Sequence, residues 1–285
     1  MSLKLDNNMS NSVIASFKHM IYLNHRAIES IECTEQLSTV GLNKLRAAKL
    51  CNLQMSRMCN IVEYLLNSDS RTAEKHLENF EIENLIEEIT KSFCATVSSY
   101  TSVNAEFHTN LKGNASILID KATFELVILN ILYCCLKNRA DGRPAPVKLS
   151  IYATENKDNV VFHIRDNNPN LEPDIVESIF AAPTPTFENL HDWSFATLIS
   201  LSLRVAYKSA EQLNGSVVYT PLKSGNRFDI SLPKYNHIDN IHTIQSLVPY
   251  VPTCSYYDEL FADVKLEFVL KEIIDCFGNP EDFKL

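Results

Sequence analysis

Residues 160–171 read Val160-Val161-Phe162-His163-Ile164-Arg165-Asp166-Asn167-Asn168-Pro169-Asn170-Leu171, and this stretch decides the fold. Its first half is a short run of β-branched and aromatic side chains interrupted by polar ones, which predicts a β-strand. Its second half gathers Asp, Asn and Pro, the residue types that form tight turns. The stretch therefore predicts a strand that delivers the carboxylate of Asp166 into a turn.

An aspartate at the point where a strand enters a tight turn is typical of the adenine-binding edge of a nucleotide site. Such sites place glycines after the aspartate, because glycine lets the backbone approach a ligand closely and takes positive φ freely. Here those two positions are Asn168 and Asn170. Asparagine tolerates positive φ better than most residues, so we expect the turn to survive while its side chains fill the nucleotide's space. Taken alone, the stretch is more typical of an ordinary surface turn.

Composition and charge narrow the functional classes. The 285 residues are 45% hydrophobic and 21% charged, enough for one large or two modest domains with their own cores. A net charge of −9 without a cluster of Lys and Arg argues against nucleic acid as a partner. We expect a cytoplasmic protein that does not insert into a membrane, because the longest apolar run is too short and no secretory signal opens the chain. The eight cysteines form no Cys-x-x-Cys pair, which favours reduced, buried thiols over a zinc site.

Residues 1–75 are expected to form a helical hairpin that dimerises. Apolar residues recur at spacings of three and four through two segments of residues 13–70, as in a coiled coil or four-helix bundle. The break around Ser38 to Gly41 is short, so the two helices should be antiparallel. Two helices bury little surface alone, so we expect a homodimer. The seam positions are Ile14, Phe17, Ile21, Asn24, Ile28 and Ile31, and then Ala48, Cys51, Met55, Met58, Val62 and Leu65.

Residues 79–235 are expected to form an α/β domain in which helices cover one face of a mixed sheet. Helical patterns cover residues 80–93, 121–138, 172–180 and 194–213, and Asn214-Gly215 ends the last helix. Strands are expected at residues 105–111, 117–119, 147–151, 160–164, 216–220 and 227–232. Residues 236–285 form a tail, in which apolar positions between Tyr257 and Phe277 predict a packed helix.

The order of these elements resembles the core of a bacterial sensor histidine kinase over about residues 13–235. The resemblance implies an α+β protein. An antiparallel hairpin would form a four-helix bundle in the dimer and carry the phosphoacceptor. A GHKL-type (Bergerat) ATPase domain, built as an α/β sandwich, would follow. Several motif positions of that ATPase domain fall in register with this sequence.

The first two motifs of that domain each keep one functional residue. In the family the first reads Asn-Leu-Leu-x-Asn-Ala on a helix, and here it corresponds to Asn130-Ile131-Leu132-Tyr133-Cys134-Cys135. Cys134 thus replaces the asparagine that holds magnesium, a hard ion that prefers oxygen ligands. The second motif reads Asp-x-Gly-x-Gly. Asp166, which would accept a hydrogen bond from the adenine amino group, is present, and asparagines replace both glycines.

The third motif, Gly-Leu-Gly-Leu, corresponds to Ser200-Leu201-Ser202-Leu203, counted back from Gly215. In the family this turn offers backbone N–H groups to the phosphates. Two serines crowd that approach and let the helix continue unbroken from about Ser194. The resemblance therefore implies a degenerate site, in which ATP and magnesium bind only if the site is still open. Its positions are Asn130, Cys134, Asp166, Asn168, Asn170, Ser200 and Ser202.

The hairpin offers a candidate phosphoacceptor, His25. Leu23-Asn24-His25-Arg26 resembles the opening of one histidine kinase subfamily, although the following residues depart from its usual Val-Lys-Asn. The acidic residue that the commoner subfamily places beside its histidine to assist nucleophilic attack is missing here. A neutral imidazole is nucleophilic near neutral pH, which keeps His25 a candidate, with His19 on the same helix as its rival. A surface histidine without a chemical role is the alternative.

Three functions fit these residues. The first is a dimeric histidine-kinase-like docking or regulatory module of a two-component system, with a response regulator or a partner kinase bound to it. The second is an ATP-independent histidine phosphotransferase that uses His25. The third is an atypical histidine kinase that autophosphorylates from ATP, which requires an open pocket between Asn130 and Asp166.

Overall fold

A computed structural model describes residues 7–34, 37–67, 77–97, 103–110, 116–138, 147–181 and 195–234. The described residues fall into two compact units, one that contains the first two helices and one that contains the sheets. The expected tail helix between Tyr257 and Phe277 lies outside the described residues. None of the helices within these ranges is long and apolar enough to cross a bilayer.

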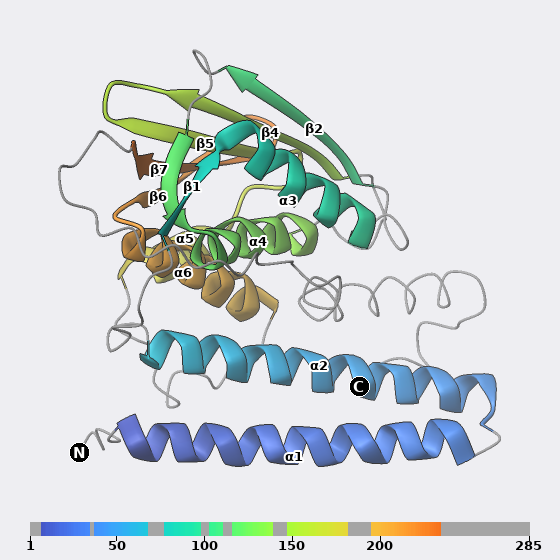
Figure 1. Cartoon of the computed structure of the whole chain (residues 1–285). Coiled ribbons are helices and arrows are strands. Elements are labelled where there is room, and N and C mark those ends of the chain that lie inside the picture. Colours follow the sequence, from blue (N-terminus) through green and yellow to red (C-terminus); the bar gives the residue numbers. More distant parts are fainter. Residues whose placement is uncertain are drawn as a thin grey trace. The chain divides into compact units, whose positions relative to one another are not determined.

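Helices α1 (Asn7–Thr34) and α2 (Thr39–Asn67) form the predicted antiparallel hairpin (Figure 1). Three side-chain pairs follow its length in opposite directions on the two helices: Lys18 with Glu63, Asn24 with Asn52, and Glu32 with Lys49. The break lies between Thr34 and Thr39, slightly before the expected position. The reason is an N-cap, since Gly41 N donates to Ser38 Oγ over 3.2 Å and lets α2 begin at Thr39.

Only part of the predicted hairpin seam is buried. The buried members are Ile14, Ile28, Met58, Val62 and Leu65. The exposed members are Phe17, Asn24, Ile31, Ala48 and Cys51. Phe17 and Ile31 leave 42% and 41% of their surface exposed, and Met20 beside them leaves 54%. The hairpin therefore carries more apolar surface than one copy of it covers.

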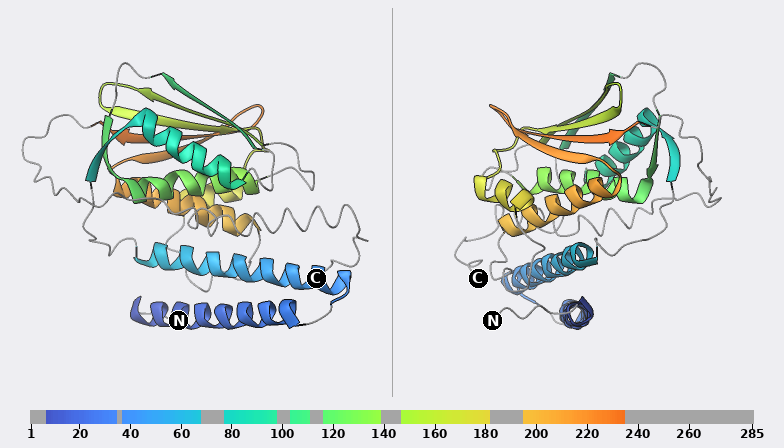
Figure 2. Two further views of the ribbon diagram at one scale, coloured as in Figure 1. Left: turned by 45° about the vertical axis from the view of Figure 1, so that its right-hand side comes forward. Right: turned by 90° about the vertical axis from the view of Figure 1, so that its left-hand side faces the viewer.

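The second unit is built on a five-stranded mixed sheet of order β2-β4-β5-β7-β6. Strand β2 runs parallel to β4, and the other neighbours are antiparallel. The strands are β2 (Val103–Asn110), β4 (Val147–Glu155), β5 (Asn159–Asp166), β6 (Ser216–Pro221) and β7 (Asn226–Pro233). Helices α3 (Ile82–Val97), α4 (Lys121–Lys137), α5 (Pro173–Ala181) and α6 (Phe195–Gln212) lie on one side of it, as expected from the sequence (Figures 1 and 2).

A second sheet pairs β1 (Leu77–Glu81) antiparallel with β3 (Ser116–Asp120). The expectation of a helix from Phe80 is wrong at its start, because Phe80 pairs with Ile117 in this sheet and α3 begins at Ile82. Phe80 fits the apolar spacing of the helix, but a strand distant in sequence takes its backbone hydrogen bonds. Local spacing alone does not reveal such a partner.

The core of this unit lies between the sheet and its helices. Strand β5 alternates strictly, so Val160, Phe162 and Ile164 are fully buried. The Phe162 ring lies 5.1 Å from the ring of Phe124 on α4. Each such side chain contributes about 1.5–3 kcal/mol by leaving water. These contacts fix β5 against α4 and so place the turn that follows β5 beside the end of α4.

Two caps set the ends of the helices that flank this turn. Asp120 begins α4, where its side chain accepts a hydrogen bond from Thr123 N over 2.8 Å. Asn214 and Gly215 end α6 as predicted: Asn214 takes φ 57° and Gly215 N donates to Ala210 O over 2.8 Å. Asn214 is the only non-glycine residue with positive φ among those described.

Candidate functional site

Strand β5 carries Asp166 to the helix side of the sheet, where its residue is 6% exposed. Its Oδ1 accepts one hydrogen bond from Asn226 Nδ2 over 2.8 Å and another from Asn168 N over 2.9 Å. The Cys135 thiol on α4 adds a third bond to this carboxylate. Burial raises the pKa of Asp166 above its ordinary value of 3.8, and the bonds from Asn226 and Asn168 oppose that shift. The carboxylate that would face adenine is thus surrounded by donors of its own chain.

The Asp166 turn, residues 166–171, is tied to the end of α4 by two asparagine side chains. Asn168 Nδ2 donates to Cys135 O over 2.5 Å, and Asn138 Nδ2 donates to Pro169 O over 2.7 Å. Cys135 lies in the last turn of α4, where carbonyl groups need partners from outside the helix. Asn168 is 8% exposed, so its side chain fills the space between the turn and the helix.

The other side of the turn is tied to strands β6 and β7. Asn226 Nδ2 also donates to Pro169 O over 2.9 Å, and its Oδ1 accepts from Tyr219 Oη over 2.8 Å. Asn170 is exposed, and its Nδ2 donates to Leu222 O over 3.2 Å. The turn is therefore held on two sides by hydrogen bonds from its own chain.

The backbone of this turn differs from the expected one. Neither Asn168 nor Asn170 takes positive φ, so the asparagines do not reproduce a glycine conformation. The left-handed residue is instead Gly225 in the β6–β7 turn, with φ 108°. A Cβ there would lie 1.9 Å from Asp166 O, so only glycine lets the two turns approach so closely. The tolerance of asparagine for positive φ is therefore not used here, and the asparagines shape the turn through their side chains.

Helix α4 places Asn130 and Cys134 on its buried side, 3% and 1% exposed. Asn130 Nδ2 donates back to Leu126 O over 2.8 Å within the helix. Burial raises the pKa of the Cys134 thiol well above its ordinary value, and the charge of Asp166 raises it further. A thiol held neutral in this way does not fit magnesium, which needs hard oxygen ligands. Across the described ranges, no three His, Cys, Asp or Glu side chains gather as a metal site.

Ser200 and Ser202 lie in the middle of α6, which runs without a break from Phe195 to Gln212. This confirms the expectation that the serines let the helix continue. Backbone N–H groups inside a helix are used by carbonyls one turn earlier, so they do not face a ligand. Ser202 is fully buried. At these positions the chain therefore forms regular helix and no turn with free N–H groups.

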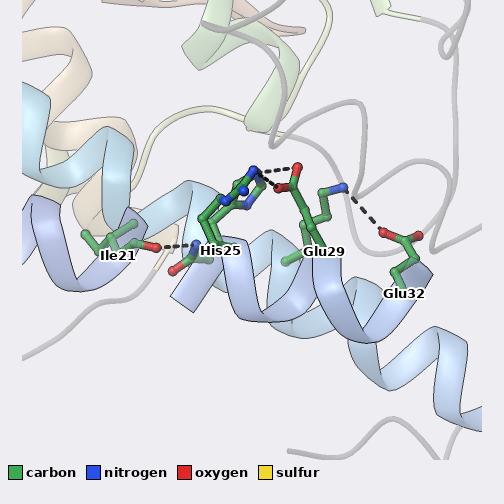
Figure 3. Close-up of polar contacts among 7 residues, drawn as sticks. Ile21, His25, Glu29 and Glu32 are labelled. Atoms are coloured by element: carbon green, nitrogen blue, oxygen red, sulfur yellow. Dashed lines mark hydrogen bonds and ion pairs between the residues drawn. The ribbon is translucent and has the colours of Figure 1, made fainter. Parts of the chain in front are cut away.

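In the helical unit, His25 Nε2 lies 3.3 Å from Glu29 Oε1, and both side chains project from α1 (Figure 3). Glu29 Oε2 also lies 3.8 Å from Arg26 Nη1. The His25 side chain is 30% exposed, and His19 is exposed elsewhere on α1. His25 lacks the adjacent acid of the commoner subfamily, as the sequence shows, but Glu29 stands one helical turn further on. The spacing of four residues on one helix was the signal that could have found it.

The structure brings together the predicted residues of the Asp166 turn and joins them to α4, on which Asn130 and Cys134 lie. Asn138, Asn226 and Glu29 were not predicted, although each contacts a predicted residue or its turn. Asn226 stands directly opposite Asp166 in the β5–β7 pairing. The sequence predicts both strands, but the register that places these two residues together depends on the folded sheet.

Comparison with known proteins gives a consistent result. Residues 119–236 match the family described as "Histidine kinase-, DNA gyrase B-, and HSP90-like ATPase". The fold is similar to the Acinetobacter baumannii histidine kinase AdeS, with TM-score 0.51 and 15% identity over 80% of this chain and 98% of AdeS. It is similar to full-length ShkA in complex with AMPPNP, with TM-score 0.61 and 16% identity over 82% of this chain and 47% of ShkA. It is also similar to the structure of histidine kinase ThkA in complex with response regulator protein TrrA. Here the TM-score is 0.54 and the identity is 16%, over 80% of this chain and 61% of the matched chain.

No curated protein sequence matches the chain. At identities of 15% to 16%, the likeness to the solved structures establishes the fold. This fold has both parts of the predicted architecture, the helical hairpin and the domain with the mixed sheet. Residues 119–236 thus match a histidine-kinase-like ATPase domain, and with the hairpin before it the chain has the fold of histidine kinase cores of known structure.

Proposed function

We propose that this protein is a cytoplasmic, dimeric docking or regulatory module of two-component signalling whose ATP site is degenerate. One observation carries the proposal: Asn226 and Asn168 donate to the Asp166 carboxylate over 2.8 and 2.9 Å, where an adenine amino group would have to bind. At Oδ1, ATP would have to compete with donors that the fold itself supplies.

The energetic argument follows from these bonds. A hydrogen bond to a charged group contributes about 1.5–3 kcal/mol, and a buried donor left without its partner costs about 1–3 kcal/mol more. An adenine amino group that took the place of Asn226 Nδ2 or Asn168 N at Oδ1 would gain one such bond while the fold lost another, so the exchange would bring no net hydrogen bond. The Cys134 thiol offers no compensation through magnesium, and α6 offers none through free amides. The exchange therefore disfavours the nucleotide.

The apolar stripe on the hairpin supports the dimer. Phe17, Met20 and Ile31 are each more than two-fifths exposed in one copy, and a four-helix bundle would cover them. The ThkA structure contains a response regulator protein bound to a histidine kinase. By analogy we assign a response regulator as the partner of this chain, with a partner kinase as the alternative.

Incubation of the purified protein with magnesium and ATP labelled in the γ-phosphate tests this proposal. The expected result is an unlabelled protein, together with saturable binding of a response regulator that is unchanged in Asp166→Asn. Label on the protein that disappears in His25→Gln would contradict the proposal and establish an active, atypical kinase.

A second candidate function rests on His25 and Glu29. The two side chains lie 3.3 Å apart, and Glu29 could hold the imidazole in one tautomer and orientation. In this function, an imidazole nitrogen of His25 attacks the acyl phosphate of a partner's phosphorylated aspartate. An N–P bond forms, the aspartyl P–O bond breaks, and the partner's carboxylate leaves.

The second candidate is tested without ATP. A response regulator labelled on its aspartate would be mixed with the protein, and the label followed over time. Transfer to the wild type and to His19→Gln, but not to His25→Gln, supports a phosphotransferase. Label that stays on the regulator in all three samples contradicts it.

A further inference from the structure

Strands β4, β5, β7 and β6 carry a row of cationic and hydroxyl side chains on the face opposite the helices. Ser150 stands opposite Arg165, Arg165 opposite Arg227, and Arg227 opposite Thr220. Side chains alternate between faces along each strand, and the strand neighbours of Ser150, Arg165 and Arg227 are buried on the core face. Thr220 is placed on the same face by its pairing with Arg227. We call these four residues the arginine row. Arg165 is exposed, and the other three are partly exposed.

Both guanidinium groups are held by contacts within the sheet. The Arg165 guanidinium lies over the Tyr152 ring, 5.1 Å from its centroid. Arg227 Nε lies 3.0 Å from Asp229 Oδ2. Arg165 makes its contact through the face of its guanidinium, and Arg227 forms an ion pair at Nε. Within the described part of the chain, the terminal nitrogens of both side chains are therefore the donors that can face a ligand. Donors held in place lose less freedom when they bind.

Two arginines that stand directly opposite each other repel, and a bound anion would offset this repulsion. Like charges directly opposite each other on neighbouring strands destabilise a sheet. The outward charges on these four strands are Lys148, Arg165 and Arg227 against Asp229, on a chain whose net charge is −9. Glu106 of β2 stands opposite Ser150 at the far end of the row, two strands away from Arg165. The Asp229 carboxylate is already engaged, through Oδ1 with His163 Nδ1 over 2.5 Å and through Oδ2 with Arg227. This face therefore concentrates positive charge on an acidic protein.

We propose that the arginine row binds a phosphate group, either free or as a phosphate monoester. Two guanidinium forks match the oxygens of a tetrahedral phosphate, and the flanking hydroxyls of Ser150 and Thr220 are the further donors of the row. The face is open, so the group that carries the phosphate can extend away from the sheet. The proposal does not depend on the degenerate ATP site, because Asp166 follows Arg165 in the strand and faces the opposite side.

The test is calorimetric titration of the full-length protein with inorganic phosphate and, separately, with O-phosphoserine at constant ionic strength. We expect saturable binding of at least one of them, weakened about tenfold or more in Arg165→Ser and in Arg227→Ser. Arg165→Lys keeps the charge and loses the fork, so it should also bind more weakly. Binding of phosphate alone would show that the site takes only the free anion. Binding of O-phosphoserine would show that it accepts a monoester.

Lys157→Ser is the matched control, because Lys157 is exposed in the β4–β5 turn at the other end of the sheet and its loss changes the net charge equally. Arg165 is exposed, so its replacement should leave the melting temperature close to that of the wild type. Equal affinities in Arg165→Ser, Arg227→Ser and Lys157→Ser would overturn the proposal. The absence of saturable binding to the wild type by either ligand would overturn it as well.

Discussion

At the scale of single residues, Asp166 behaves as a structural carboxylate. It lies on the core side of β5, and Asn226, Asn168 and the Cys135 thiol supply its hydrogen bonds. Burial disfavours its charged form and raises its pKa, while the hydrogen bonds moderate the rise. A group of this kind links folding stability to pH.

The pH dependence of Asp166→Asn follows from that shift. A carboxyl group whose pKa is raised in the folded state stabilises the fold fully below its unfolded pKa, near the ordinary value of 3.8, and loses that contribution as the pH rises through the folded pKa. Asparagine does not titrate. We therefore expect the free energy of unfolding of the wild type, relative to Asp166→Asn, to decrease as the pH rises from acid toward neutral. Urea denaturation of both proteins across this pH range measures the two free energies of unfolding. If the wild type gains stability relative to Asp166→Asn as the pH rises, the prediction is wrong.

Asn168 gives a second prediction at the same scale. Asn168→Gly removes the bond to Cys135 O and adds backbone freedom to the unfolded chain, so it should lower the free energy of unfolding by about 1–3 kcal/mol. Asn170→Gly is the control, since Asn170 is exposed and its bond to Leu222 O is 3.2 Å long. Urea denaturation should therefore show a smaller loss for Asn170→Gly. Equal losses would mean that Asn168 does not tie the turn to α4.

The sequence predicts some of the residues around Asp166 and misses others, for a physical reason. Asp166 and Asn168 belong to one local pattern, a strand followed by a turn, and local patterns are visible in sequence. Asn226 acts on them from β7, and its role depends on strand register. Its chemistry is that of an ordinary amide, so nothing in its neighbours distinguishes it before the sheet is assembled.

At the scale of elements, α6 is the element that differs most from what a nucleotide-binding site would require. It passes through Ser200 and Ser202 as regular helix, where a phosphate-binding turn would interrupt it. The serines explain this continuity, because serine is tolerated within helices and glycine weakens them. Local propensity was a sufficient signal here, and the predicted helix of residues 194–213 agrees with the structure. At β1 the same kind of local reasoning failed, because Phe80 fits both a helix and a strand.

A glycine restored in α6 should weaken the helix. Ser202→Gly is expected to lower the free energy of unfolding by about 0.5–1 kcal/mol, and loss of the buried hydroxyl's contacts adds to this. Thermal melting followed by circular dichroism at the helix band measures the change. Ser202→Ala removes the hydroxyl without weakening the helix, because alanine is the better helix former, so any loss of stability in Ser202→Ala reports the hydroxyl alone. A Ser202→Gly protein as stable as the wild type would contradict a continuous α6.

At the scale of the whole molecule, the hairpin leads to a testable prediction about the oligomeric state of the protein. The exposed apolar side chains on α1 predict a homodimer of twice 32.3 kDa. Phe17→Glu places a charge in that stripe and should shift the protein toward the monomer, measured by sedimentation equilibrium. Ala15→Glu, an exposed position on the same helix, is the matched control and should leave the dimer intact. A wild type that sediments as a monomer contradicts the assignment.

In the proposed function, such a dimer binds its two-component partners without using a nucleotide. The hairpin and the apolar core of the second unit are kept, while the positions that would contact magnesium, adenine and phosphates have other structural roles. Cys134 is buried in α4, Asn168 joins a turn to a helix, and Ser202 lies within α6. This pattern agrees with the docking or regulatory function proposed above.

The most direct test is the melting temperature of the wild type and of Asp166→Asn, titrated with ATP in the presence of magnesium. A ligand that binds the folded state raises the melting temperature in a saturable way. If the Asp166 turn is closed by Asn226 and Asn168, neither protein will show a saturable rise. A saturable rise in the wild type that is absent in Asp166→Asn would show that Asp166 still binds adenine, and would contradict the account.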